Sequence, residues 1–135
     1  MKLTPYLHLA GNASEALDFY ATVFGGEITM RTTYGDSPMP SEDDWKDKLM
    51  HARLVFGDNM IMLSDSFKGQ APLSTGNVQL SIEISDAAKI ESTFNAIAEG
   101  GTITMPLQEQ FWGAKFGMLL DKFGIAWMFN HELKK

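Results

Sequence analysis

The six residues GGEITM, Gly25 to Met30, recur later in the chain as GGTITM, Gly100 to Met105, and the two copies differ in a single letter. Before each copy, apolar residues recur at three- and four-residue spacing, which is typical of an amphipathic helix. These residues are Ala13, Ala16, Leu17, Tyr20, Val23 and Phe24 before the first copy, and Ala87, Ile90, Phe94, Ile97 and Ala98 before the second. The threonine-containing stretch after each glycine pair favours a strand. The sequence therefore predicts the same helix-to-strand junction twice.

Residues at the ends of the two predicted helices support these boundaries. Asn12 can cap the first helix, with Glu15 three positions later completing a capping box. Ser85 or Asp86 can cap the second helix. The first glycine of each pair can adopt the left-handed conformation that ends a helix.

Strand-like segments surround both helices in the same order. PYLHLA (5–10) and VQLSIEIS (78–85) come before the helices. The strands after the junctions are MHARLVF (50–56) and NMIMLS (59–64) in the first half, and KFGMLLD (115–121) and IAWMFN (125–130) in the second. The order is βαβββ, twice, and such duplication indicates that neither half can bury its apolar face alone.

We therefore expect an α+β fold in which two βαβββ modules, 1–66 and 77–135, form a single domain joined by a linker at 67–76. Four strands per module can curl into a concave sheet with the helix on its convex side, so that two half-barrels surround a cleft. The polar, acidic segment 35–48 predicts a long mobile loop, and a role as a lid stays open.

Composition excludes several classes of function. The chain has no cysteine, which excludes disulfides, thiolate nucleophiles and cysteine zinc sites. A net charge of −6 disfavours nucleic acid as a partner and modestly favours a cationic ligand. The start, MKLTPYLHLAG, is too short for a signal peptide or a membrane span, so we expect a cytoplasmic protein with no membrane partner.

Three segments carry a resemblance to a known family: PYLHLAGNASEALDFYATVFGGE, LVFGDNMIMLSD and QEQFWGAKFGMLLDKFGIAWMFN. They resemble the PhnB-like branch of the vicinal oxygen chelate superfamily, which includes glyoxalase I, ring-cleaving dioxygenases, and fosfomycin- and bleomycin-resistance proteins. The resemblance covers nearly the whole chain. It implies paired βαβββ modules and a homodimer, but it leaves the chemistry open.

The metal site of the superfamily can be compared position by position. Its four ligands come from the first and last strands of each module, and the resemblance places them at Pro5, Met62, Gln79 and Met128. Proline has no side-chain donor, and thioethers suit soft copper rather than magnesium, manganese or zinc. We therefore expect no metal and no other cofactor, unless a divalent metal has moved to a relocated site.

Strand alternation predicts which polar residues share the cleft. His51 and Arg53 lie on the face of their strand opposite Ala52 and Leu54, and Gln79 and Glu83 lie on the polar face of theirs. We expect His51, Arg53, Gln79 and Glu83 to form a polar group in an apolar pocket. There His51 and Glu83 would act as a general base and its orienting carboxylate, or Arg53 would bind an anion. A surface ion-pair network is an equal alternative.

Three further residues are predicted to line the cleft, and a fourth to be turned away from it. Trp112, at an exposed turn beside Gly113, can cover a ligand at the cleft mouth, while Met62 and Met128 can form an adaptable apolar wall. His8 lies an odd number of residues from Pro5, which predicts that it faces away from the cleft as a partly buried structural residue.

Three functions remain for this combination of features. The first is a metal-free protein that binds a small organic ligand in its cleft. The second is an enzyme of lyase, isomerase or dioxygenase type, which would use His51 and Glu83 or a relocated metal. The third is a structural or regulatory dimer with a decayed cleft.

Overall fold

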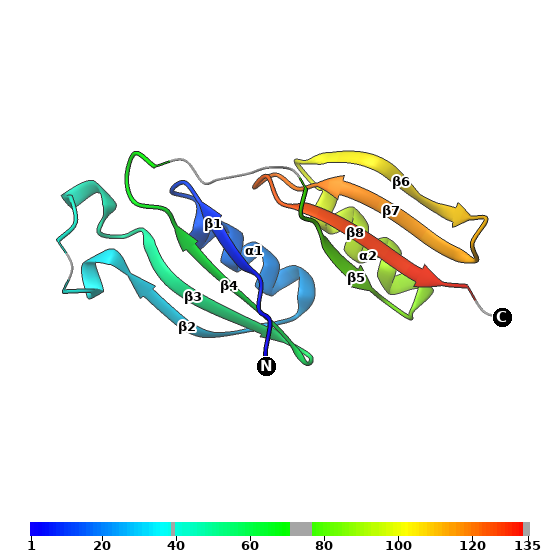
Figure 1. The fold of residues 1–135 in the computed structure, drawn as a ribbon, viewed down its shortest axis with the longest axis horizontal. Coiled ribbons are helices and arrows are strands. Elements are labelled where there is room, and N and C mark those ends of the chain that lie inside the picture. Colours follow the sequence, from blue (N-terminus) through cyan, green and yellow to red (C-terminus); the bar gives the residue numbers. More distant parts are fainter. Residues whose placement is uncertain (39, 71–76, 134–135) are drawn as a thin grey trace. The chain divides into compact units, whose positions relative to one another are not determined.

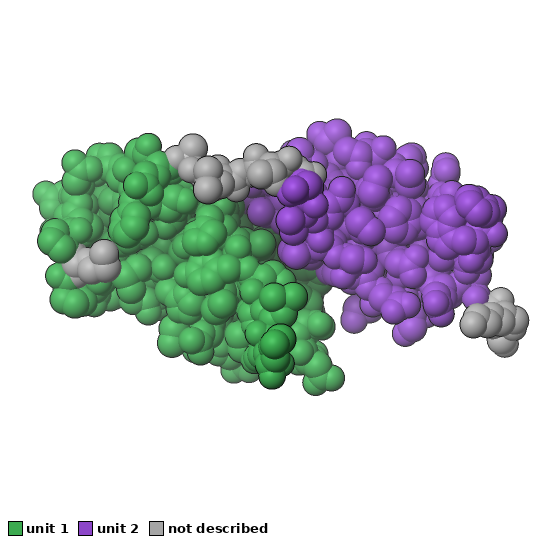
Figure 2. All heavy atoms as spheres, viewed as in Figure 1, with its two compact units in different colours: residues 1–73 green, residues 74–135 purple. Residues whose placement is uncertain are grey.

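The computed structural model describes residues 1–38, 40–70 and 77–133. The chain divides into two compact units, residues 1–73 and 74–135, which Figure 2 shows in different colours. The linker expected at 67–76 lies for the most part outside the described residues and stays a prediction. The described helices include none that is long and apolar enough to cross a bilayer.

The expected order βαβββ is present in both units, as Figure 1 shows. The first unit contains β1 (Tyr6–Leu9), α1 (Ala13–Phe24), β2 (Glu27–Thr33), β3 (Leu49–Phe56) and β4 (Asn59–Asp65). The second contains β5 (Leu80–Glu83), α2 (Ala87–Ala98), β6 (Thr102–Gln110), β7 (Ala114–Leu120) and β8 (Ala126–Glu132). The α+β prediction and the two βαβββ repeats are therefore confirmed.

Each unit has one four-stranded sheet, and the two sheets have the same topology. The strand orders are β1-β4-β3-β2 and β5-β8-β7-β6. In each sheet the strand before the helix pairs in parallel with the last strand of its unit, and the other pairs are antiparallel. Within the described residues the sheets are open, because no strand pairs with both edges of a sheet.

Apolar residues from the helix and from alternate strand positions form the core of the first unit. Its buried members are Leu7, Leu9, Ala13, Ala16, Leu17, Tyr20, Ala52, Leu54, Ile61 and Leu63. Because successive strand residues point to opposite faces, the remaining positions lie on the face away from α1. We call this surface the helix-free face of the unit.

The two GG junctions have the same construction, which explains the repeated letters. Gly25 and Gly100 have positive φ angles of 64° and 76° and end the helices, as the sequence predicts. The second glycine fits against a neighbouring strand: a Cβ on Gly26 would lie 2.9 Å from the carbonyl oxygen of Val55. A Cβ on Gly101 would overlap the carbonyl oxygen of Leu120. Each junction therefore needs two glycines for two different reasons.

The predicted capping box at the first helix is wrong. Asn12 makes no side-chain cap hydrogen bond. Instead Asp65, at the end of β4, accepts hydrogen bonds from the backbone N–H groups of Gly11 (2.7 Å), Ala13 (2.9 Å) and Leu49 (2.9 Å). In the second unit the local prediction is confirmed, because Asp86 accepts from the amides of the first turn of α2.

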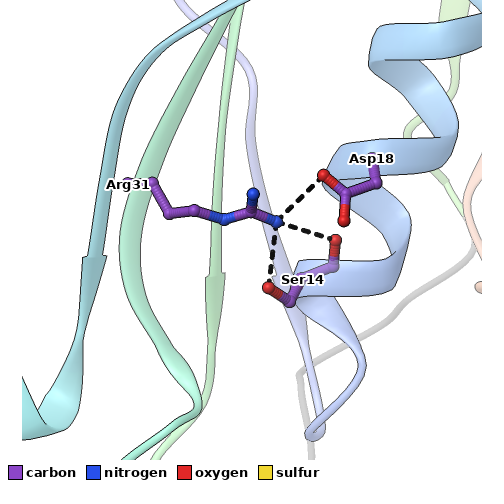
Figure 3. Close-up of polar contacts among 3 residues, drawn as sticks. All are labelled: Ser14, Asp18 and Arg31. Atoms are coloured by element: carbon purple, nitrogen blue, oxygen red, sulfur yellow. Dashed lines mark hydrogen bonds and ion pairs between the residues drawn. The ribbon is translucent and has the colours of Figure 1, made fainter.

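Arg31 of the edge strand β2 forms hydrogen bonds and an ion pair with α1. The guanidinium of Arg31 donates to the hydroxyl and carbonyl oxygens of Ser14 (3.0 and 3.3 Å) and to Asp18 (3.0 Å), as Figure 3 shows. These groups are exposed to solvent, where ion pairs contribute little. The contact therefore contributes little to the stability of the fold.

The described part of the loop expected at 35–48 is fixed to the first unit at its base. The Trp45 indole donates to the carbonyl oxygen of Ser66 at 3.2 Å, and Lys48 Nζ donates to the carbonyl oxygen of Gly11 at 3.0 Å. Lys68 forms ion pairs with Glu42 and Asp44. These contacts join the loop to the start of α1 and to the segment after β4.

The turn between β7 and β8, from Asp121 to Trp127, lies in the third segment that resembles the family. The carboxylate of Asp121 accepts from the backbone of Phe123 (2.9 Å) and Ile125 (3.0 Å) and from the Trp127 indole (2.8 Å). Asp121 and Trp127 are both buried. This part of the resemblance therefore records a structural turn, not a reacting group.

Candidate functional site

The helix-free face of the first unit carries a group of polar and aromatic side chains. Tyr6 and His8 come from β1, and His51 and Arg53 come from β3; we call these four residues the Tyr6–Arg53 cluster. Met62 of β4 lies opposite both Tyr6 and Arg53 in the sheet register. Together with Met62, the cluster therefore extends across three neighbouring strands, β1, β4 and β3.

Two hydrogen bonds fix the tautomer of His51. Its Nε2 atom lies 3.2 Å from Arg53 Nε, and its Nδ1 atom lies 2.9 Å from the Tyr6 hydroxyl. Arginine Nε can only donate, so Nε2 of His51 must be an unprotonated acceptor. A neutral imidazole then carries its hydrogen on Nδ1 and donates it to the Tyr6 oxygen. The bonds run in one direction, from Arg53 through His51 to Tyr6.

The surroundings of His51 keep its ring neutral. Partial burial lowers the pKa of His51, and the positive charge of Arg53 lowers this pKa further. Both causes act against the protonated form, which would also lose the hydrogen bond from Arg53. At neutral pH His51 is therefore an uncharged link between a cation and a phenol.

His8 lies on the same face as this chain of hydrogen bonds, so the prediction that it faces away is wrong. Its ring stacks on Tyr6 with 4.7 Å between ring centroids and 10° between planes, and its Nδ1 lies 3.2 Å from Ser64 Oγ. The error has a simple cause. Tyr6, rather than Pro5, lies opposite Met62, so face assignments counted from Pro5 are inverted.

Tyr6 and His8 are the site residues that the sequence analysis missed. The signal was present in PYLHLA, where the two residues alternate with Leu7 and Leu9. Both leucines are buried against α1, while Tyr6 is 37% exposed. The same alternation rule that was applied to β3 would have found the pair on β1.

The second unit presents its predicted residues on its own helix-free face. Ser81 and Glu83 are exposed while Leu80 and Ile82 are half-buried, which is the expected alternation. Gln79, just before β5, is exposed as well. Met128 lies opposite Ser81 in the register. Glu83 and Met128 thus come from neighbouring strands of one sheet.

Trp112 lies in the exposed turn between β6 and β7, as expected. Its side chain is 52% exposed and makes edge contacts with Phe111 and Phe116, whose ring centroids lie 5.1 and 5.8 Å away. Phe111 is 97% exposed. That Trp112 covers a ligand stays a prediction.

The structure brings together one part of the predicted site. His51, Arg53 and Met62 share the helix-free face of the first unit, whereas Gln79, Glu83 and Met128 belong to the second unit. A pairing of His51 with Glu83 would join residues of different units and stays a prediction. Within the first unit, both ring nitrogens of His51 already have partners.

The donors at the family's metal positions are poor ligands for a hard cation. In the first unit these positions offer Met62 and, beside it, Tyr6, while Pro5 contributes only a carbonyl oxygen that accepts from the Met62 amide at 3.0 Å. Among the described residues no three His, Asp or Glu side chains converge. The side chains present therefore do not fit a divalent metal at these positions.

One open depression lies elsewhere, between α2 and the edge strand β6. Its volume is about 310 Å³, and its walls are Glu91, Phe94, Asn95, Ile103, Pro106 and Leu107. It occurs where the register of β6 with β7 is interrupted between Met105 and Gln108. Glu91 already forms an ion pair with Lys115. We attribute the depression to the irregular strand rather than to a binding site.

The fold is shared with a solved structure of known class. Two units of βαβββ, each with a four-stranded sheet, also make up a glyoxylase/bleomycin resistance protein/dioxygenase domain from Frankia sp. EAN1pec, which has a TM-score of 0.69 at 16% identity over 98% of this chain and 97% of that one.

Sequence comparison then identifies the family. The model of the family described as 3-demethylubiquinone-9 3-methyltransferase matches residues 1–129, and the chain belongs to this PhnB-like family. Protein YjdN of Escherichia coli K12 is 32% identical, with 96% of this chain and 95% of that protein covered.

Two solved structures agree with this assignment. Protein PA1353 from Pseudomonas aeruginosa is 42% identical with a TM-score of 0.90, and 99% of each chain is covered. A PhnB protein from Bacillus cereus is 29% identical with a TM-score of 0.83, covering 97% of this chain and 99% of that one.

Proposed function

We propose that this protein binds a small organic ligand on the helix-free face of its first unit, without the metal of its superfamily. The observation that carries the proposal is the state of Arg53. Its Nε is held by a neutral histidine, and within residues 1–38, 40–70 and 77–133 it forms no ion pair. An exposed guanidinium oriented in this way is suited to a ligand.

The surroundings of Arg53 support a binding site over a solvated surface. The stacked rings of Tyr6 and His8 lie on the same face and add aromatic surface to it. Met62 lies between Tyr6 and Arg53 in the register and offers an adaptable apolar floor. A few oriented polar groups around an apolar surface are the usual make-up of a small-molecule site.

The family description names a methyltransferase. Membership of a family and a fold does not by itself establish the chemistry of a site. We therefore do not transfer the methyltransferase activity to this chain.

One observation favours an enzyme as the second candidate. His51 is neutral at neutral pH because its pKa is lowered, and a neutral imidazole can accept a proton on Nε2 once the hydrogen bond from Arg53 is released. In this alternative His51 would act with Glu83 as an acid–base pair. A ligand that remains chemically unchanged after long incubation with the protein would argue for binding alone.

A fragment screen read by NMR tests the proposed function. The protein would be labelled at its methionine methyl groups, and Met62 would report on the helix-free face of the first unit. We expect a subset of fragments to shift the Met62 signal in the wild type and in Arg31→Gln. The same fragments should bind more weakly to Arg53→Gln.

The two arginines make this a matched comparison. Arg31 is on the same sheet but bonds to Ser14 and Asp18 of α1, away from the proposed site. Fragments that bind but never shift Met62 would contradict the proposed location. A complete absence of binding would instead favour a structural or regulatory homodimer, whose mass light scattering would measure.

A further inference from the structure

We infer that the Tyr6 hydroxyl and the Arg53 guanidinium together recognise a carboxylate on a planar, conjugated ligand. This inference rests on the proposed function and names the ligand class for the same face. It assigns His51 the role of a positioning residue and adds Tyr6 as a residue that contacts the ligand.

The direction of the hydrogen bonds leaves the Tyr6 proton available. Since His51 donates from Nδ1, the Tyr6 oxygen acts as an acceptor in their 2.9 Å contact. A phenol has one O–H donor, and that donor is not used in this bond. No other hydrogen bond of the Tyr6 hydroxyl exists among the described residues. The O–H group can therefore donate to a ligand oxygen.

The same geometry leaves most of the Arg53 guanidinium available. Its Nε–H is directed at His51, which fixes the plane of the group. The two Nη nitrogens carry the remaining N–H donors and make no hydrogen bond among the described residues. Parallel N–H donors in a fixed fork fit the two oxygens of a carboxylate.

The sheet register places the two donors on either side of one residue. Tyr6 and Arg53 are each paired with Met62, from the neighbouring strands β1 and β3. Adjacent strands are about 4.8 Å apart, so the two backbones are separated by roughly 10 Å. Long side chains can close that distance, and His51 bridges it. A carboxylate above Met62 would thus lie between a phenol and a guanidinium.

The stacked rings indicate what the rest of the ligand is. Tyr6 and His8 are nearly parallel, at 10° between planes, and both lie on the exposed side of β1. Because the two rings face each other, they present their edges and outer faces, and a flat conjugated group attached to the carboxylate can pack against one of these, where aromatic contact contributes favourably. The two parts of the surface therefore fit an aromatic or otherwise planar acid.

One carboxylate of the protein lies on the same face and could compete. Glu27 of β2 pairs with Val55, two positions along β3 from Arg53. The structure shows no ion pair between Glu27 and Arg53 among the described residues. If Glu27 competes for the guanidinium, the variant Glu27→Gln should bind an acid more tightly than the wild type.

Benzoate and benzamide are suitable probes, because they have the same ring and nearly the same shape but differ in charge. We expect benzoate to shift the Met62 methyl signal and benzamide to bind at least about tenfold more weakly. Tyr6→Phe and Arg53→Gln should each weaken benzoate binding roughly ten- to hundredfold, since each removes a hydrogen bond to a charged group. Arg31→Gln should bind benzoate like the wild type.

Three outcomes would overturn the inference. These are equal binding of benzoate and benzamide, undiminished benzoate binding by Tyr6→Phe, and no benzoate binding. In each case neutral fragments that shift Met62 would leave the proposed function intact. Melting curves of each variant establish that a loss of binding does not come from unfolding.

Discussion

His51 shows at the scale of one residue how neighbours decide a chemical state. A histidine between an arginine and a tyrosine could be read as an ion-pair partner, a metal ligand or a base. The contact with Arg53 Nε restricts the choice, because it requires an unprotonated Nε2. With Nδ1 bonded to Tyr6, neither nitrogen is available to a metal without breaking a hydrogen bond.

This state predicts a pH dependence of stability. The pKa of His51 is lowered from 6.5 in the folded protein. As pH falls below that value, the unfolded chain therefore takes up a proton before the folded chain does. The stability present above pH 6.5 is lost progressively until the folded-state pKa is reached. Urea unfolding between pH 7.5 and 5.5 should show a larger decrease for the wild type than for His51→Gln.

Glutamine is the appropriate replacement because it offers an acceptor and a donor but does not titrate. The other lowered pKa values, of Asp44 and Glu91, start from 3.8 and 4.5 and act at lower pH. Equal slopes for wild type and variant over this range would contradict the assigned state of His51.

Asp65 carries the second residue-scale prediction. Asp65→Asn replaces one acceptor oxygen by an NH₂ group, which would face a backbone N–H in a buried site. We expect the free energy of unfolding to decrease by about 3 kcal/mol. Asn12→Ala is the control and should change stability by about 0.5 kcal/mol or less, because Asn12 makes no cap bond. A larger loss of stability in Asn12→Ala would contradict this assignment and would support a capping role for Asn12.

At the scale of elements, the glycine pairs show what the sequence does reveal. The repeated letters predicted both junctions, both helices and the strands after them, because helix stops and apolar periods are local signals. The function of the second glycine is not local. Its close contact is with a strand that follows later in the chain, Val55 for Gly26 and Leu120 for Gly101.

Substitution by alanine should separate the two roles. Gly101→Ala places a Cβ against the carbonyl oxygen of Leu120 and 2.9 Å from the Cα of Asp121, so backbone must move. We expect a loss of about 3 kcal/mol. Gly25→Ala meets nothing within 4 Å and should lose only about 1 kcal/mol, from the positive φ angle. Chemical denaturation of both variants measures the difference, and a larger loss at Gly25 would refute it.

The candidate site was predictable only in part, and the reason is also structural. The faces of β3 and β5 followed from alternation within each strand. The face of β1 was assigned from Pro5, and a shift of one residue inverted it, since side-chain period in a strand is two. Contacts such as Tyr6 with His51, which join residues of β1 and β3, depend on sheet pairing that a single sequence does not display.

At the scale of the whole molecule, we expect the chain to bind no divalent metal at the positions that hold it in the superfamily. After treatment with a chelator, the full chain should bind manganese, zinc and nickel without a stoichiometric site, because Met62 and Met128 offer thioethers. Elemental analysis and calorimetric titration measure this. One tightly bound ion per chain would contradict the expectation, and repeating the titration with His8→Ala and His51→Ala would then locate the ligands.

We expect the two helices to form at different stages of folding, because their caps come from different distances along the chain. α2 is capped by Asp86, which immediately precedes it, so its first turn can be stabilised as soon as the helix itself is made. The cap of α1 is Asp65, which ends β4 and is therefore synthesised only after β2 and β3. Contacts between residues far apart in the sequence form slowly. We therefore expect α2 to begin to form by itself and α1 to form fully only when β4 has joined its sheet.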